Sequence, residues 1–249
     1  MLLIFGGTTE GKQVIQLMQA LKQPYHYSTK TKVDYKADKL GVYRHGALDE
    51  AALLVYIQKY KIKKIINAAH PFATVLHQTI AKVCSALAVP VYRLERSYLE
   101  RQVHPLIHYI ATYEETLELL LNQFKGKKLL ALTGVQSMAL LAVYWKVYPT
   151  LFRILDRPSS IAIAEAQKFP RMQLILAYPN KELDKEIKLY KAHKIEVVLT
   201  KESGNSGQMS TKIAAALALE IPIIIIKKPK LPKTFESIND LETLKNKFL

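Results

Sequence analysis

Short apolar runs rich in β-branched residues alternate with longer amphipathic stretches along almost the whole chain. The first run, residues 2–5, is wholly apolar, which is typical of a strand buried on both faces of a sheet. The next stretch, residues 10–21, spaces Val14, Ile15 and Met18 so that they share one face of a helix. The chain is therefore predicted to begin with a buried strand and an amphipathic helix.

The same two periodicities predict a regular alternation of strands and helices. The predicted strands are residues 2–5, 25–29, 42–44, 64–67, 91–94, 128–132, 151–155, 172–177, 196–200 and 222–226. The predicted helices are residues 10–21, 49–61, 71–87, 113–124, 136–146, a segment after 158, 181–192, 208–219 and a last helix from about 237. A less regular stretch, residues 95–112, separates the two halves.

Apolar strands separated by helices are typical of parallel sheets that are covered on both faces. We therefore predict an α/β protein of two Rossmann-like domains, with mostly parallel sheets and an interdomain cleft. The predicted domains are residues 1–112, which would bind a nucleotide, and residues 113–249. Ligands of open α/β sheets bind at the carboxyl ends of the strands, so the loops after strands are the candidate sites.

The composition excludes several classes of protein. No apolar run among the 249 residues approaches the roughly 20 that a membrane-spanning helix needs. The N-terminus lacks the basic region and the cleavage site that are typical of a signal peptide. Cys84 is the single cysteine, and no Cys/His cluster indicates a metal site. We expect a cytoplasmic protein without a membrane partner or a metal.

The formal net charge of +15 is open to two interpretations. The lysines either form an ordinary solvated surface or attract anions such as phosphate cofactors and multiply carboxylated substrates. They are scattered over many predicted helices, and no helix-turn-helix, RNP-type or zinc-finger pattern accompanies them. We therefore expect no nucleic-acid partner.

The first candidate site is the sequence GGTTEG at residues 6–11, which follows the first strand and opens the first helix. Glycines there allow a tight turn and a close approach to a pyrophosphate, and the helix N-terminus supplies amide groups and partial positive charge. Thr8 replaces the second glycine of the G-x-G-x-x-G pattern, and its hydroxyl or that of Thr9 is a candidate hydrogen-bonding group. The alternative is a plain strand-to-helix turn.

The end of the second predicted strand indicates which nucleotide would bind. Proteins that use NAD usually have Asp or Glu there for the ribose 2′-hydroxyl. This chain has Thr29 and Lys30, and Asp34 is the next acidic residue. Hydroxyls and cations suit a 2′-phosphate, which favours NADPH over NADH. An exposed basic turn is the alternative.

A third loop has His70 followed by Pro71, between a strand end and a helix start. Proline suits the first helical turn, which would place His70 at or near the N-cap. Its imidazole could orient a cofactor or substrate or supply a proton, although a purely structural cap is also open.

Loops of the second half repeat the strand–turn–helix pattern. Thr133, Gly134 and Ser137 follow one strand, and Arg153 and Arg157 bracket the end of the next. The sequence TKESGNSG at residues 200–207 precedes a helix that holds a lysine. Its small polar residues and flanking lysines indicate an anion-binding loop, and a flexible connection is the alternative.

In their order and spacing these loops resemble the precorrin-6A reductase family of cobalamin biosynthesis over nearly the whole chain. The resemblance is carried by residues 6–11, by HPFA at 70–73, YRLER at 92–96, LTG at 132–134 and TKESGNSG at 200–207. Asn67 and Ala68 depart from the family, which usually has an acid and a threonine before the His-Pro pair.

The resemblance implies an NADPH-dependent oxidoreductase acting on a CH–CH group of precorrin-6A or its cobalt form. A polycarboxylated tetrapyrrole is the implied partner, the cofactor is NADPH, and the oligomeric state stays open. The candidate catalytic residue is His70. The candidate cofactor-binding residues are Gly6, Gly7, Thr8, Thr9, Glu10, Gly11, Thr29, Lys30, Thr133, Lys201, Ser203 and Gly204. The candidate substrate-binding residues are Arg93, Arg96, Arg153, Arg157, Ser206, Gly207 and Lys212.

Two other functions remain open at this point. One is an NADPH-dependent reductase of the same fold that acts on another anionic substrate. The other is a non-catalytic nucleotide-binding module that uses the first glycine loop alone.

Overall fold

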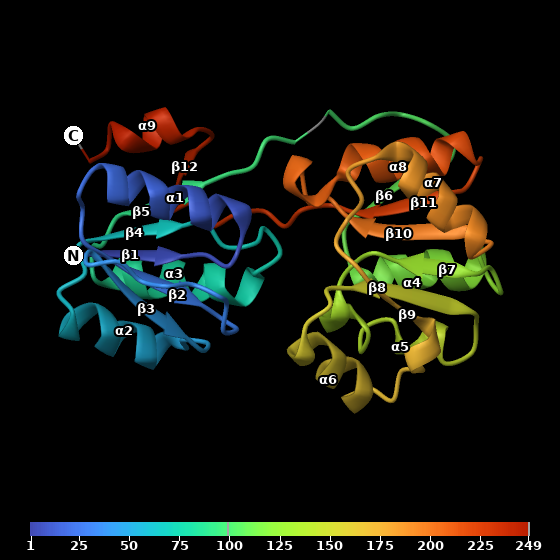
Figure 1. Ribbon diagram of the computed structural model, residues 1–249, viewed down its shortest axis with the longest axis horizontal. Coiled ribbons are helices and arrows are strands. Elements are labelled where there is room, and N and C mark those ends of the chain that lie inside the picture. Colours follow the sequence, from blue (N-terminus) through green and yellow to red (C-terminus); the bar gives the residue numbers. More distant parts are fainter. Residues whose placement is uncertain (99, 249) are drawn as a thin grey trace. The chain divides into compact units, whose positions relative to one another are not determined.

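A computed structural model describes residues 1–98 and 100–248. The chain forms two compact units, of which the first comprises Met1–Ser97 with Pro229–Leu249 and the second Tyr98–Lys228. The prediction placed the boundary after residue 112 and the whole C-terminal half in the second domain, whereas the second unit begins at Tyr98 and the C-terminal segment returns to the first unit. Figure 1 shows this return, with the red C-terminal elements beside the blue N-terminal ones.

The first unit is a parallel six-stranded sheet in the order β12-β5-β4-β1-β2-β3. The strands are β1 (Leu2–Phe5), β2 (Tyr25–Thr29), β3 (Gly41–His45), β4 (Lys64–Asn67), β5 (Val91–Leu94) and β12 (Glu236–Ile238). The helices are α1 (Thr9–Ala20), α2 (Glu50–Lys59), α3 (Thr74–Ala86) and α9 (Leu241–Lys245). α1 contacts α9, and α2 contacts α3.

The apolar run of β1 serves two cores because successive side chains of a strand point to opposite faces. Leu2 and Ile4 pack in a cluster with Met18 of α1. Leu3 and Phe5 pack in a second cluster that includes residues of α2 and α3. All four strand residues are buried, which explains why the run contains no polar position.

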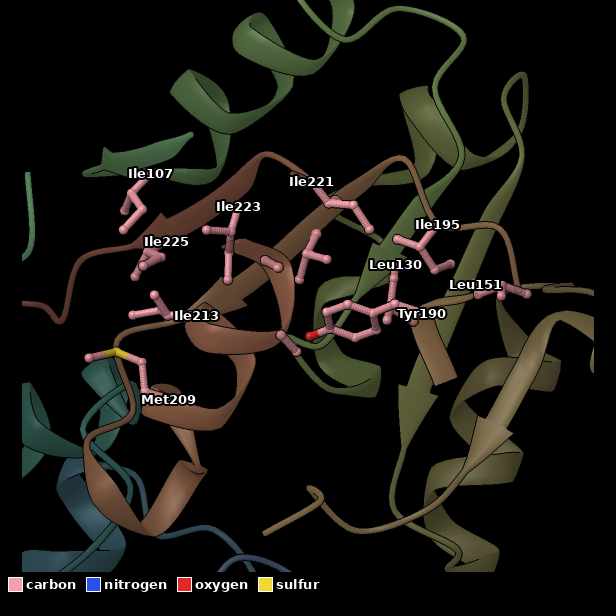
Figure 2. Close-up of a cluster of buried hydrophobic side chains, with 13 residues drawn as sticks. Ile107, Leu130, Leu151, Tyr190, Ile195, Met209, Ile213, Ile221, Ile223 and Ile225 are labelled. Atoms are coloured by element: carbon pink, nitrogen blue, oxygen red, sulfur yellow. The ribbon is translucent and has the colours of Figure 1, made fainter. Parts of the chain in front are cut away.

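The second unit is also a parallel six-stranded sheet, in the order β6-β11-β10-β7-β8-β9. The strands are β6 (Ile107–Ile110), β7 (Leu129–Ala131), β8 (Thr150–Ile154), β9 (Leu174–Leu176), β10 (Val197–Lys201) and β11 (Ile223–Ile226). The helices are α4 (Tyr113–Asn122), α5 (Ala142–Trp145), α6 (Pro158–Ala166), α7 (Leu183–Ala192) and α8 (Met209–Ala218). Figure 2 shows one core of this unit, where Ile213 of α8 lies near Ile225 and Tyr190 of α7 lies near Leu130.

The pattern prediction was wrong at several short elements. β6 lies in the stretch interpreted as irregular, and β12 lies where the last helix was expected to start. Both are edge strands held by a single neighbour, β11 and β5 respectively. The helix predicted at 136–146 is a 3₁₀ turn at Val135–Ser137 followed by α5. There the Ser137 hydroxyl donates to the Gly134 carbonyl, a side-chain bond that competes with helix formation.

A buried hydrogen-bond network fixes the loop after β4. Asn67 is fully buried, and its amide nitrogen lies 2.9 Å from His77 Nδ1. His77 Nε2 lies 3.2 Å from the His70 carbonyl oxygen, so the ring donates there and accepts from Asn67. Arg93 donates to the carbonyl oxygens of Asn67 and Ala69 and to the Asn67 side chain. A neutral His77 can therefore make both hydrogen bonds, one as the acceptor and one as the donor.

Burial, reinforced by the positive charge of Arg93, lowers the pKa of His77 to about 4. The unfolded chain therefore binds a proton at this histidine more readily than the folded one, and the folded protein loses stability as the pH falls from about 6.5 towards 4. We expect the wild-type free energy of unfolding to drop by about 2 kcal/mol more than that of His77→Gln between about pH 7.5 and pH 5.

Chemical unfolding at the two pH values measures this difference. Circular dichroism follows both units, and fluorescence of Trp145, the chain's one tryptophan, follows the second unit. His104→Gln, which alters an exposed histidine, serves as the control and should leave the pH dependence unchanged. Equal pH dependence in the wild type and His77→Gln would contradict the assignment.

Candidate functional site

The first sheet has a topological switch point between β1 and β4. From β1 the chain continues through α1 to β2 on one side, and from β4 through α3 to β5 on the other. The loops after these two strands are joined by Thr8, whose hydroxyl donates to the Ala68 carbonyl at 2.6 Å. The same oxygen accepts from the Gly11 amide at 3.0 Å and so caps α1. Ligands of open α/β sheets bind at such a place.

The geometry of this loop requires glycine. A Cβ on Gly6 would lie 2.5 Å from a ring carbon of Tyr27, and Gly7 has a φ of +88°. The Gly7 amide donates to the Tyr27 hydroxyl at 2.8 Å, which holds the turn against β2. Thr9 is exposed in the first turn of α1, where backbone amides lack intrahelical acceptors. These features fit a loop that admits a phosphate group to the helix N-terminus.

Glu10 and Arg96 form an ion pair beside the start of α1. Their charged atoms lie 2.9 Å apart, and both side chains are almost wholly buried. Arg96 follows β5, so the pair attaches that loop to the first turn of α1. The carboxylate of Glu10 is thereby balanced by a cation of the same unit.

Arg93, predicted to bind substrate, lies in the interior of the first unit. Its side chain is 1% exposed and pairs with Glu95 at 2.9 Å, besides the bonds to the β4 loop. In this arrangement the guanidinium supports the loop that carries His70. The sequence pattern indicated an arginine near a strand end, but it did not indicate that the side chain points into the interior of the unit.

His70 itself is half-buried and lies in the loop before α3. Its Nδ1 accepts from the Phe72 amide at 3.2 Å, so the neutral ring carries its proton on Nε2. His70 was predicted at or near the N-cap; α3 begins at Thr74 with Ala73 as its N-cap, so His70 lies three residues before the cap. The short turn between them includes the hydrogen bond from the Ala73 amide to the His70 carbonyl.

The end of β2 differs from the expectation in one respect. Thr29 is buried, and its hydroxyl donates to the Thr31 carbonyl at 2.7 Å and contacts the Tyr43 hydroxyl at 2.9 Å. Lys30 is exposed at the same edge. A cation that the sequence pattern did not identify, Arg44 of β3, lies beside Ser28 because β2 and β3 pair in register there. No local sequence signal reveals that register.

The second sheet has its switch point between β7 and β10. Thr133 lies in the loop after β7, and Lys201 is the last residue of β10, so both are at the carboxyl edge of the sheet. Thr133 is buried and shares a 2.6 Å hydrogen bond with Ser137. The Lys201 ammonium lies 5.7 Å from the ring centroid of Tyr113, and burial lowers the pKa of Lys201 to about 8.

Residues 203–207 form a tight turn after β10. Gly204 has a φ of +67°, and the Gly207 amide donates to its carbonyl at 3.1 Å. A Cβ on Gly207 would overlap the Ser203 hydroxyl, so glycine is required there. Ser203 is buried, whereas Ser206 is exposed. The turn thus brings small polar residues together before α8.

Two predicted substrate ligands lie inside the second unit. Arg153 pairs with Glu186 at 2.7 Å, and both side chains are almost completely buried. Lys212 is buried on α8, with its ammonium 3.3 Å from the Thr200 hydroxyl. Burial, followed by the nearby charge of Arg153, lowers the pKa of Lys212 to about 7. Arg157, by contrast, is half-exposed at the N-cap of α6.

Glu186 is the acceptor at the centre of this network and was not identified from the sequence. Asn180 and Tyr190 also donate to its two oxygens, at 2.6 and 3.0 Å. Within residues 1–98 and 100–248, no group of three or more His, Cys, Asp or Glu side chains forms a metal site. In the same described residues no helix is long and apolar enough to cross a membrane.

Comparison with known proteins identifies the family. The family model described as precorrin-6x reductase CbiJ/CobK matches residues 1–246. The cobalt-precorrin-6A reductase of Methanocaldococcus jannaschii is 30% identical over 250 residues, which cover 96% of each chain. The precorrin-6A reductase of Mycobacterium tuberculosis is 26% identical over 242 residues, covering 96% of this chain and 93% of that one.

A solved structure of a CobK precorrin-6A reductase shares the fold. It aligns with a TM-score of 0.79 and 21% identity, covering 99% of this chain and 95% of its own. The resemblance inferred from the strand-end loops is thus confirmed by sequence and fold over nearly the full length. The chain belongs to the precorrin-6x reductase family, a family of oxidoreductases of cobalamin biosynthesis.

Proposed function

We propose that the chain reduces one double bond of precorrin-6A, or of its cobalt form, with NADPH in the cytoplasm. The observation that carries the proposal is the glycine loop at the switch point of the first sheet, tied by Thr8 to the loop of His70. Family membership supplies the class of substrate. The crowding of Gly6 by Tyr27 and the capped start of α1 fit a dinucleotide.

The first unit would hold the cofactor through the loop at residues 6–11. Gly6, Gly7 and Gly11 allow close approach of a pyrophosphate, and Thr8 and Thr9 lie where α1 begins. The ion pair with Arg96 offsets the negative charge of Glu10, so the first turn of α1 keeps its attraction for phosphate. When bound, NADPH supplies a hydride.

His70 is the residue we propose to act at the reacting groups. Because Nδ1 already accepts from the Phe72 amide, Nε2 is the atom that can donate to a substrate carboxylate or to the carboxamide of the cofactor. The reduction adds hydride to one carbon of the conjugated macrocycle and a proton to its neighbour. The proton comes from water or from a protein acid, and a protonated His70 is the candidate on the protein.

Anionic groups would be bound at the carboxyl edge of the second sheet. The macrocycle carries several acetate and propionate carboxylates, which a basic protein attracts. The groups that we propose for this role, or for contacts with the cofactor, are Thr133, Arg157, Lys201, Ser203, Gly204, Ser206 and Gly207. Arg93, Arg153 and Lys212 would act indirectly, since they support the loops from within.

Turnover with purified protein tests the proposal directly. We expect loss of the NADPH absorbance band with precorrin-6A or its cobalt form, and faster oxidation of NADPH than of NADH. Oxidation with one macrocycle would assign the metal-free or the cobalt-containing substrate. NADPH binding without oxidation in either mixture would instead favour a reductase of another anionic substrate or a non-catalytic module.

Replacing His70 separates a role at the reacting groups from a role in cofactor binding. We expect His70→Ala to lower kcat by about 100-fold, the typical contribution of a general acid, with NADPH affinity close to that of the wild type. His104→Ala is a matched control, because His104 Nδ1 likewise accepts a hydrogen bond from the backbone amide two residues later, that of Leu106, at 3.1 Å. Unchanged kcat in His70→Ala would remove the residue from the chemistry.

Lys201 gives the second unit a pH-dependent affinity for anions. With a pKa of about 8, its ammonium loses charge as the pH rises through 8, so anion binding should weaken between about pH 7 and pH 9. Lys201→Arg keeps its charge over this range and should flatten the profile. Tetrapyrrole binding measured by absorbance titration tests this, with the exposed Lys191→Arg as control. A profile that Lys201→Arg leaves unchanged would exclude Lys201.

A further inference from the structure

Arg44 of β3 is an arginine held in a defined position at the carboxyl edge of the first sheet. Its Nη1 donates to the Ser28 hydroxyl at 2.6 Å, and its Nη2 donates to the His45 carbonyl at 3.1 Å. The guanidinium also lies 5.7 Å from the ring centroid of Tyr56. The side chain is half-buried, so these contacts restrain it while leaving part of it accessible.

The charge of Arg44 is not balanced by a carboxylate within 4 Å among residues 1–98 and 100–248. The arginines whose side chains are almost wholly buried differ in this respect. Their carboxylate partners are Glu95 for Arg93, Glu10 for Arg96 and Glu186 for Arg153. Arg44 therefore presents a fixed positive charge that favours an anion from outside the chain.

The position of Arg44 relative to the glycine loop is set within one sheet. The Gly6 amide donates to the Ser28 carbonyl at 3.0 Å, which joins the glycine loop to the end of β2. The Gly46 amide donates to the carbonyls of Thr29 and Lys30, which joins the end of β3 to the same place. A dinucleotide whose pyrophosphate lies at the start of α1 places its adenosine ribose over the end of β2.

We propose that Arg44 is the residue that selects NADPH by binding its 2′-phosphate. The planar guanidinium suits bidentate recognition of phosphate, and Ser28 positions it. Lys30, exposed at the same edge, adds charge. The end of β2 has no acid that would bind a 2′-hydroxyl and repel the phosphate. The inference rests on the proposed NADPH dependence and names the residue responsible for it.

The test compares two small probes that differ by one phosphate. Adenosine 2′,5′-bisphosphate and AMP are titrated into the full-length protein by isothermal titration calorimetry. We expect the wild type to prefer the bisphosphate, and Arg44→Gln to bind it about 10- to 100-fold more weakly with little change for AMP, the range expected for losing hydrogen bonds to a charged group. Arg44→Lys should retain part of the preference, because it keeps charge but loses the fork.

Lys59→Gln is the matched control. It removes one positive charge from the last turn of α2, an exposed position at the opposite end of that helix from its start after β3. It should bind both probes as the wild type does, and thermal unfolding should show that Arg44→Gln and Lys59→Gln stay folded.

The outcomes separate this inference from the proposed function. A wild type that prefers the bisphosphate together with an Arg44→Gln variant that keeps the full preference overturns the role of Arg44 and leaves NADPH dependence intact. A wild type that binds both probes equally contradicts the NADPH preference, and the role of Arg44 fails with it. A wild type that binds neither probe contradicts nucleotide binding by the first unit.

Discussion

The candidate site of the first unit depends on the hydrogen bonds made by the side-chain amide of Asn67. It is fully buried at the end of β4, where its nitrogen meets His77 and its oxygen accepts from the Ala69 amide and from Arg93. His77 and Arg93 then bind the backbone of the loop that carries His70. Because Asn67 is a neutral amide with an N–H to donate, a neutral His77 accepts that hydrogen bond and donates its own proton to the His70 carbonyl.

The interior of the second unit contains a buried network of charged side chains. Two cations, Arg153 and Lys212, lie near a single carboxylate, Glu186, whose oxygens also accept from an amide and a phenol. Charge in a low-dielectric interior is costly unless it is balanced. The lowered pKa of Lys212 relieves that cost, because the lysine can lose its proton near neutral pH. The network that supports the strand-end loops of the second unit therefore has a net charge close to zero.

Strand-end loops were predictable from the sequence because long apolar runs and helix starts are local signals. The strands from β1 to β5 and from β7 to β11 were all anticipated, and so were the loops at both switch points. β6 and β12 were not, since an edge strand with one neighbour is stabilised by pairing that lies far away in the sequence. The direction of Arg93 and the nearness of Arg44 to Ser28 depend on strand register, which no local pattern contains.

A carboxylate in the first turn of α1 raises a question for any phosphate-binding role, because two negative groups at one helix start repel each other. Arg96 reduces this repulsion, because its guanidinium lies 2.9 Å from the Glu10 carboxylate and both side chains are almost wholly buried. At this distance the two opposite charges largely cancel, and the electric field of the pair falls off within a short distance. The partial positive charge of the helix N-terminus at the edge of the sheet is therefore not cancelled by Glu10. The pair also attaches the loop after β5 to α1, so Arg96, which was predicted to bind substrate, instead neutralises a carboxylate in the first turn of α1.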